Sequence, residues 1–222
     1  MKHWIWHRLL INLKRWSRAG IYEMLDEQLN ADSFKQILSI GGFGPVNEHI
    51  YKIVSSGCGK LTTLDIDEHH YPEILADVSD CSQVIPACSF DAVIAIEVFE
   101  HVFDSRKAIG ECNKILKENG VLIFSTPWIT PIHDRPFDFY RFTPEALKEL
   151  CQGFSSVAIY ARGNYFDSLV VLMLRGLFSK GLAPRIFLMV GTFLSKVSPL
   201  PKVYSDLSRI DSTIGYFVVA VK

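Results

Sequence analysis

The sequence predicts an α/β fold built on a doubly wound, mostly parallel sheet of seven strands. Three observations predict it. Short apolar runs alternate with segments whose apolar residues have helical spacing. The run Phe90–Ile96 is apolar at six of its seven positions, which is typical of a strand covered on both faces in a parallel sheet. Acidic residues stand at the ends of two of these runs, at Asp65 and Glu97, and open α/β sheets bind their ligands at the carboxyl ends of strands.

Length and composition fit one such domain with additional segments. The chain has 222 residues, of which 49% are hydrophobic and 21% charged, so it can bury a sizeable core. Its five cysteines show no CxxC spacing, which favours free thiols, no zinc or other metal site, and a reducing compartment such as the cytoplasm. We expect an N-terminal helical extension over residues 1–34 and an α/β domain over 35–222. An apolar helical insertion is expected at 165–205, before the last strand.

The seven strands are predicted from apolar, β-branched runs bounded by turn residues. In chain order they are Gln36–Ile40, Leu61–Ile66, Glu73–Val78, Phe90–Ile96, Val121–Ser125, Val157–Ala161 and Ile214–Val221. Apolar residues recur with helical spacing over Ser105–Lys117, and Asn119–Gly120 would end that helix. Thr143 is a suitable N-cap for a further helix that begins with Pro144.

The net charge of −1 conceals two basic segments. Residues 1–18 and 168–205 each hold five lysine or arginine residues and no acidic residue, and both are rich in large apolar side chains. Such segments can dock on the protein and keep a solvated basic face, or they can lie on an anionic membrane surface. Neither has the roughly 20 consecutive apolar residues of a membrane-spanning helix. We therefore expect a cytoplasmic protein, with a peripheral position on a membrane as the second possibility.

A glycine-rich turn follows the first predicted strand. Gly41, Gly42 and Gly44 would let the backbone approach a ligand closely where the next helix begins. Asp65, 24 residues after Gly41, lies at the end of the second strand, where an acid can accept hydrogen bonds from both ribose hydroxyls. Dinucleotide sites and adenosyl-cofactor sites share this pair of features. Each feature alone is also common as a plain turn or as a solvated acid at a strand end.

The order and spacing of five motifs resemble those of class I S-adenosylmethionine-dependent methyltransferases, with the greatest similarity to the type 11 methyltransferase domains. The motifs are Ile37–Gly44, Leu64–Asp67, Ala76–Asp77, Phe90–His101 and Asn119–Pro127. The resemblance covers residues 36–162 and the closing strand near 214–221. It implies a Rossmann-like methyltransferase fold and S-adenosyl-L-methionine as the cofactor.

The resemblance also implies a set of residues that hold the cofactor: Gly41, Gly42, Gly44, Asp65, Ile66, Asp77, Val78 and Glu97. The glycines would pass beneath the methionine part of the cofactor, near Glu97. Asp65 would bind the ribose hydroxyls, and Ile66 would pack against the adenine. Asp77 would accept a hydrogen bond from the adenine amino group; its alternative role is that of a surface acid in a turn.

Two positions depart from the first motif of the family. Ser39 stands where the family usually has an acid, and Pro45 stands where it has a third glycine. The alternative function is therefore a non-catalytic scaffold or binding protein with a degenerate methyltransferase fold. A Rossmann-type oxidoreductase is disfavoured because the turn lacks GxGxxG spacing. Nucleic-acid methylation is disfavoured because the core carries an excess of acidic residues.

A second cluster of polar and aromatic residues follows the fifth predicted strand, in residues 131–143. It is similar to a segment found in a subset of these methyltransferases, several of which are thought to act on cell-surface glycans. We expect Tyr140 and Arg141 to contact the substrate, since the arginine fork can hold a carboxylate or phosphate. The alternative is that Asp138 and Arg141 form an ion pair that fixes the loop.

An oxygen acceptor benefits from a base that removes its proton. His133 is the first candidate, because histidine titrates near neutral pH, and Asp138 would orient it. His101 is the second candidate, although a histidine at the start of a helix is more often structural. The sequence thus predicts an enzyme that transfers methyl groups to a small-molecule, sugar or lipid-linked acceptor. It does not distinguish an oxygen acceptor from a nitrogen or carbon acceptor.

Overall fold

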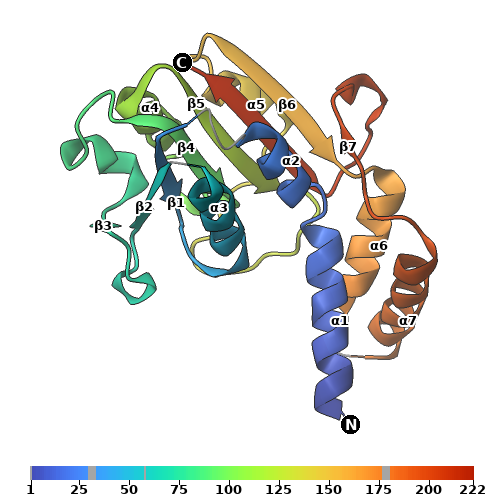
Figure 1. Ribbon diagram of the computed structural model, residues 1–222. Helices are drawn as coiled ribbons and strands as arrows, with labels where there is room; N and C mark the ends of the chain where they lie inside the picture. Colours follow the sequence, from blue (N-terminus) through green and yellow to red (C-terminus); the bar gives the residue numbers. More distant parts are fainter. Residues whose placement is uncertain (1, 30–33, 58, 177–180) are drawn as a thin grey trace. The chain divides into compact units, whose positions relative to one another are not determined.

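The computed structural model describes residues 2–29, 34–57, 59–176 and 181–222 (Figure 1). These residues form two compact units. The α/β unit comprises residues 22–127, 134–159 and 217–222, and the helical unit comprises residues 1–21, 128–133 and 160–216. Residues 30–33 of the predicted extension and 177–180 of the predicted insertion lie outside this description.

The strands form a sheet with the order β3-β2-β1-β4-β5-β8-β6-β7. Their bounds are β1 Gln36–Ile40, β2 Lys60–Asp65, β3 Ile74–Leu75, β4 Phe90–Ile96, β5 Leu116–Pro127, β6 Ser156–Arg162, β7 Val203–Tyr204 and β8 Gly215–Val221. Parallel pairing joins β3 to β2, β2 to β1, β1 to β4 and β4 to β5. The centre of β4, residues 92–95, is completely buried. The predicted α/β class and the mostly parallel sheet are confirmed.

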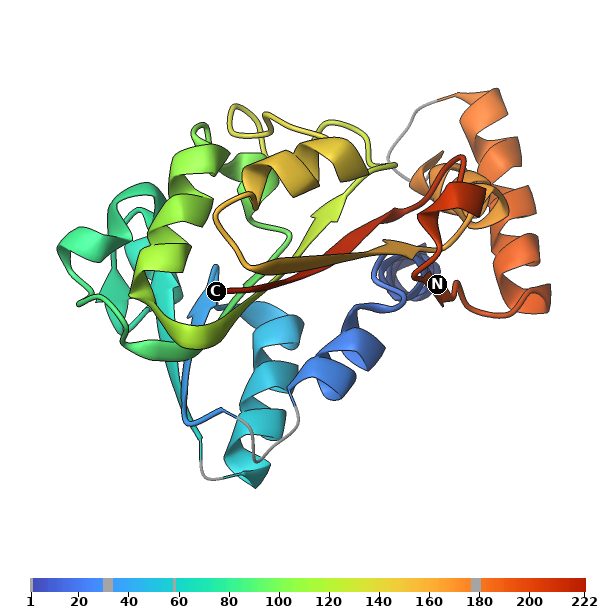
Figure 2. The same ribbon diagram turned by 90° about the horizontal axis from the view of Figure 1, so that it is seen from above.

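Helices cover both faces of the sheet in the α/β unit. Figure 2 shows α4 and α5 on one face and α2 and α3 on the other, which is the doubly wound arrangement. Their bounds are α2 Ile21–Gln28, α3 Gly44–Ser56, α4 Ser105–Ile115 and α5 Pro144–Leu150. Thr143 caps α5 as predicted, because its hydroxyl accepts a hydrogen bond from the Ala146 N–H at 3.2 Å.

The structure corrects three predicted elements. The third strand contains only Ile74–Leu75, because the chain turns at Asp77 into the short 3₁₀ helix η2, Val78–Gln83. Helix α4 ends at Ile115 and not at Lys117, because Leu116 already pairs with Phe90 as the first residue of β5. The eighth strand, β7, lies within the predicted helical insertion and pairs antiparallel with the end of β6.

Three helices make up most of the helical unit: α1 Lys2–Ser17, α6 Tyr165–Arg175 and α7 Leu182–Val197. They lie side by side (Figure 1). Leu13 and Trp16 of α1 are buried in a shared apolar cluster with Val171 and Leu174 of α6. Lys14 remains exposed, so α1 packs through an apolar face and keeps a basic outer face. None of the described helices combines the length and apolar character that are needed to cross a lipid bilayer.

Candidate active site

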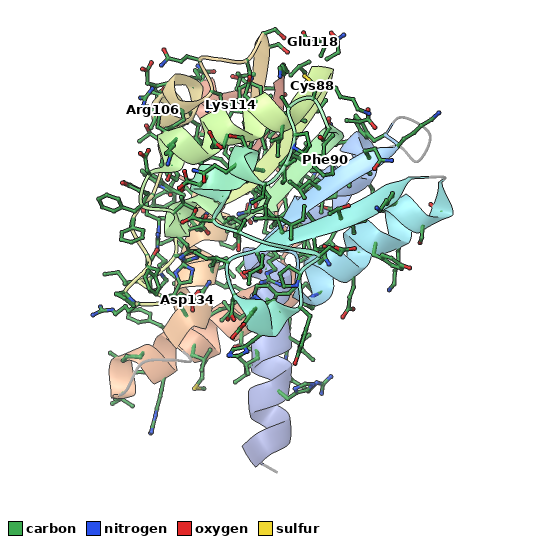
Figure 3. All side chains as sticks on the ribbon, turned by 90° about the vertical axis from the view of Figure 1, so that its left-hand side faces the viewer. Cys88, Phe90, Arg106, Lys114, Glu118 and Asp134 are labelled. Atoms are coloured by element: carbon green, nitrogen blue, oxygen red, sulfur yellow. The ribbon has the colours of Figure 1, made fainter. Side chains whose placement is uncertain are left out.

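The parallel registers bring the predicted motifs of the α/β unit to one edge of the sheet. Ile40, the last residue of β1, pairs with Leu64 of β2 and with Ala95 of β4. The glycine turn, Asp65 and Glu97 therefore leave neighbouring strands at the same level. Figure 3 shows Phe90, which begins β4, at the opposite end of this unit from Asp134. The polar residues that follow the strands thus gather at the carboxyl edge, where open α/β sheets bind ligands.

The turn after β1 requires glycine at its first two positions. Gly41 has a φ of 66°, and a Cβ on it would lie 2.9 Å from Val98 Cγ2. A Cβ on Gly42 would lie 2.9 Å from Thr63 Cγ2. At Gly44, φ is 73°, but a Cβ would meet no atom within 4 Å, so the space in front of the first turn of α3 is open. The backbone can therefore be approached closely by a ligand at this point.

Asp65 lies at the end of β2 and its residue is 7% exposed. Its Oδ1 accepts a hydrogen bond from the Asp67 N–H at 2.9 Å, and its Oδ2 lies 2.9 Å from Nδ1 of His70. A carboxylate has about four acceptor positions, so both oxygens can still accept from a ligand. The carboxylate is thus held by the protein and retains capacity for a ribose diol.

Apolar side chains are exposed beside Asp65. Ile66 is 71% exposed, and Leu75, whose neighbour in the register is Asp65, is 56% exposed. Two exposed apolar side chains next to an acid are suited to bind an aromatic nucleobase that carries polar groups at its edge. Asp77 is exposed and its side chain accepts from the Ser79 N–H at 2.8 Å, whereas Val78 is buried. Asp77 therefore caps η2, which matches its alternative role as a turn acid and leaves it accessible.

Glu97 follows β4 with a left-handed backbone, at a φ of 55°. Its N–H donates to the carbonyl of Ser125 at 2.9 Å, which continues the pairing with β5. Non-glycine residues rarely adopt this conformation, and such residues cluster at functional sites. The backbone turns at Glu97 and ends β4 there. Glu97 therefore lies at the carboxyl edge of the sheet, as the glycine turn and Asp65 do.

Part of the chain matches a known protein family. Residues 43–124 match the family model described as "Methyltransferase domain". This segment contains the end of the glycine turn, Asp65 and Glu97. This segment of the chain is therefore similar to the methyltransferase domain family.

Two relatives illustrate the extent of this similarity. A probable S-adenosylmethionine-dependent methyltransferase of Mycobacterium tuberculosis is 24% identical over 110 residues, which are 39% of this chain and 40% of that protein. The ubiquinone biosynthesis O-methyltransferase of Actinobacillus pleuropneumoniae is 31% identical over 118 residues, which are 47% of this chain and 50% of that protein. The chain thus matches about half of each relative's length or less.

Solved structures show the same fold. A methyltransferase from Archaeoglobus fulgidus has a TM-score of 0.58 and 16% identity, with 92% of this chain and 94% of that one covered. Phosphoethanolamine N-methyltransferase 2 of Haemonchus contortus, solved with S-adenosyl-L-methionine, has a TM-score of 0.59 and 15% identity, with 95% and 56% covered. At this level of identity the similarity establishes the methyltransferase fold.

The His101 ring has a fixed orientation. It ends the short 3₁₀ helix η3, Phe99–His101, and its Nδ1 lies 2.9 Å from the carbonyl oxygen of Phe137. A carbonyl only accepts, so Nδ1 carries the hydrogen and Nε2 has the lone pair of the neutral ring. Nε2 lies 3.7 Å from Oε1 of the completely buried Glu100 and 4.0 Å from Oδ2 of Asp134. The carboxylates of Glu100 and Asp134 would therefore pair with the ring when Nε2 takes up a proton.

Asp138 and Arg141 form a bidentate ion pair in the loop that follows. Nη1 of Arg141 lies 2.6 Å from Oδ1 and Nη2 lies 2.9 Å from Oδ2 of Asp138, whose side chain is 2% exposed. The hydrogen bond with Asp138 raises the pKa of Arg141, and the charges of Glu100 and Glu97 raise it further. The hydroxyl of Tyr140 donates to the carbonyl of Phe103 at 2.7 Å. The structure therefore contains the loop-fixing pair, and substrate contact by Tyr140 and Arg141 stays a prediction.

His133 belongs to residues 128–133 of the helical unit, whereas His101 and Asp138 belong to the α/β unit. The role of His133 as the base, and that of Asp138 as its orienting group, therefore stay predictions. The predicted set of site residues omits His70. A histidine five residues after the ribose acid was the available signal for this residue.

Proposed function

We propose that this chain transfers a methyl group from S-adenosyl-L-methionine to a small-molecule, glycan or lipid-linked acceptor. The observation that carries the proposal is the register of β1, β2 and β4, which aligns Gly41, Asp65 and Glu97 at one edge of the sheet. We also propose that the methyltransferase domain extends over residues 35–222, with residues 1–34 as an extension and 165–205 as an insertion.

The residues at this edge fit the cofactor. Asp65 would bind the ribose hydroxyls, and the exposed side chain of Ile66 would pack against the adenine. The open space in front of Gly44 would admit the methionine part, and Glu97 would lie near its ammonium group. The bound cofactor supplies a methyl group on a sulfonium, which is activated for in-line displacement. Acids suit this ligand because its sulfonium and ammonium groups are positively charged.

The protein contributes alignment and proton removal. Holding the acceptor in line lowers the barrier without a covalent intermediate. We assign the role of base to His101, because the Phe137 carbonyl fixes Nε2 as the ring nitrogen that takes a proton. Glu100 and Asp134 would then pair with the charged ring. An oxygen acceptor needs this step, whereas an unprotonated amine does not.

Calorimetric titration of the full chain with S-adenosylmethionine and S-adenosylhomocysteine tests the cofactor, with Asp65→Ala as the matched variant. We expect micromolar binding that the variant loses. Absence of binding at millimolar cofactor would favour the alternative, a non-catalytic scaffold, to which the substitutions Ser39 and Pro45 in the first motif point. An acceptor screen that detects S-adenosylhomocysteine release then tests turnover. The screen compares three classes of candidate acceptor: small molecules, glycans and lipid-linked compounds.

We further propose that the protein contacts anionic membranes peripherally, through the exposed face of α7. Apolar side chains at helical spacing, each at least 41% exposed, line this face: Leu182, Ile186, Met189, Val190, Phe193 and Val197. Arg185 and Lys196 are exposed, and their spacing from Met189 places both on one edge of this apolar stripe. An apolar stripe with a basic edge favours a surface of anionic lipid.

Charge disfavours a second copy of the chain as the occupant of this face. Residues 168–205 hold no acidic residue, so two apposed stripes would bring their basic edges together without a partner of opposite charge. The basic segment 1–18 would add attraction through Lys14 and Arg15, which are exposed on α1. A lipid-linked acceptor would then be met at the membrane surface.

Vesicle co-sedimentation tests this contact with the full chain. We expect binding to vesicles of phosphatidylcholine with phosphatidylglycerol, and weaker binding to phosphatidylcholine alone. The triple variant Ile186→Ser, Met189→Ser, Phe193→Ser should reduce binding at least about tenfold, since each exposed apolar side chain adds to it. The variant Tyr51→Ser, Val84→Ser removes similarly exposed residues of the α/β unit and should bind normally. Equal loss in both variants, or a dimer that only the triple variant dissociates, would overturn the membrane proposal.

A further inference from the structure

His70 links the two parts of the sequence that would hold the cofactor. Its Nδ1 lies 2.9 Å from Oδ2 of Asp65. Its ring stacks on the ring of Phe43, with centroids 3.7 Å apart and an angle of 16° between the planes. Phe43 lies within the glycine turn, directly before α3, and Asp65 lies at the end of β2. One imidazole therefore contacts both the glycine turn and the predicted ribose acid.

The backbone around His70 is built to hold the ring in this place. His70 ends the 3₁₀ helix η1, Glu68–His70, which Asp67 caps by accepting from the His69 N–H at 2.9 Å. Tyr71 follows in the left-handed conformation, with a φ of 51°, and its N–H donates to the carbonyl of Glu68 at 3.0 Å. A capped turn closed by a strained residue leaves the segment little freedom to move the ring.

The two hydrogen bonds to Asp65 fix its carboxylate from one side. Oδ1 is held by the Asp67 N–H and Oδ2 by the His70 ring, so the carboxylate plane cannot rotate freely. Because a carboxylate only accepts, Nδ1 carries the hydrogen, and the remaining acceptor positions of both oxygens stay available. Preorganisation of this kind lowers the side-chain entropy that the site loses when a ligand binds.

We propose that His70 is a positioning residue of the cofactor site, which holds Asp65 in the orientation that accepts from the ribose and which, with Phe43, forms a wall beside it. This inference rests on the proposed function, since it assigns the ribose to Asp65. The Nδ1 donor carries this role because it acts on the carboxylate, whereas the aromatic face packs on Phe43.

Two substitutions separate these properties. His70→Asn places an amide N–H near the position of Nδ1 and lacks the aromatic face. His70→Phe keeps a ring against Phe43 and lacks the donor. We expect His70→Phe to weaken binding of S-adenosylhomocysteine about tenfold, as for loss of a hydrogen bond to a charged group, and His70→Asn to retain most of the affinity. Thermal unfolding of both variants checks that the fold is intact.

A double-mutant cycle with Asp65→Ala decides whether His70 acts through the carboxylate. We expect His70→Phe to add no further loss in the Asp65→Ala background, with affinities measured by calorimetry at millimolar ligand. Additive losses, or equal effects of the Asn and Phe variants, would overturn the positioning role and leave the proposed function intact. Tighter binding by His70→Phe would also overturn it, because His70 would then compete with the ribose for Asp65. Absence of binding by the unaltered chain would overturn the proposed function, and this inference with it.

Discussion

His101 donates a hydrogen bond from Nδ1 to the carbonyl oxygen of Phe137 at 2.9 Å, across 36 residues of sequence. The bond connects η3 to the loop after β5 and places a ring hydrogen on Nδ1. The N–H of Phe139 strengthens the same connection, since it donates to the carbonyl of Glu100 at 2.9 Å. The orientation of the proposed base therefore depends on the same loop that holds the Asp138–Arg141 pair.

Replacing His101 separates its anchoring role from its role as base. His101→Asn keeps an N–H near the position of Nδ1, so the contact with Phe137 should survive, but it removes Nε2. We expect methyl transfer to an oxygen acceptor to fall about 10²- to 10⁴-fold, with cofactor affinity within about twofold of the unaltered chain. The rate of S-adenosylhomocysteine formation across pH measures the effect. Normal turnover by this variant would exclude His101 as the base and return His133 to first place.

Replacing each of two glycines by alanine separates the cost of a left-handed backbone from the cost of a steric clash. Gly41→Ala combines a φ of 66° with a Cβ 2.9 Å from Val98 Cγ2, whereas Gly44→Ala has a φ of 73° and no atom within 4 Å. We expect Gly44→Ala to lower the free energy of unfolding by about 1 kcal/mol, and Gly41→Ala to lower it by more. Urea unfolding of both variants provides the comparison. Equal losses would show that Val98 moves aside without cost.

The Asp138–Arg141 pair should stabilise the loop more than an exposed pair does. Arg141→Lys removes the bidentate fork to a carboxylate that is almost fully buried, and we expect it to cost about 1–3 kcal/mol. Arg106 and Glu149 lie 3.5 Å apart with side chains 54% and 62% exposed, so Arg106→Gln is the control and should cost below about 1 kcal/mol. Chemical unfolding at pH 7 measures both. A cost at Arg141 no larger than that at Arg106 would contradict a structural role for the pair.

Asp91 should contribute to the acid sensitivity of the fold. Burial raises the pKa of Asp91, but hydrogen bonds from Lys117 and from the Gln36 and Lys35 N–H groups outweigh burial, so the pKa lies below its usual value. A lowered pKa adds stability above the pKa of the unfolded state, and this stability is lost as pH falls through the pKa of the folded state.

The variant Asp91→Asn tests this dependence. We expect a loss of about 1–2 kcal/mol at pH 7 that shrinks below about pH 4, where the carboxyl group of the unfolded chain takes up its proton and the native carboxylate follows at lower pH. Unfolding free energies measured from pH 3 to pH 7 follow the difference. The exposed Glu118, replaced by Gln, is the control and should show a flat difference. If the difference in unfolding free energy between Asp91→Asn and the unaltered chain stayed constant from pH 3 to pH 7, the lowered pKa of Asp91 would not contribute to acid sensitivity.

Several elements were predictable because their signal is local. The strands Gln36–Ile40 and Phe90–Ile96 were predicted with the bounds that the structure has, since apolar runs with turn residues at their ends leave few alternatives. The Thr143 cap needed only the residues up to Ala146. The end of α4 was wrong because a contact distant in sequence decided it: Leu116 pairs with Phe90, and this pairing outweighs the helical signal of Asn119–Gly120.

The sequence by itself determined the α/β class, the order of the strands along the chain and the positions of the glycine turn, Asp65 and Glu97. Periodicity and turn chemistry specify these features within a few residues. Only the tertiary structure decided which ring nitrogen of His101 carries the hydrogen and that His70 holds Asp65. Each of these depends on the direction of a side chain in space, which a backbone turn or a partner 36 residues away sets and which no local pattern encodes.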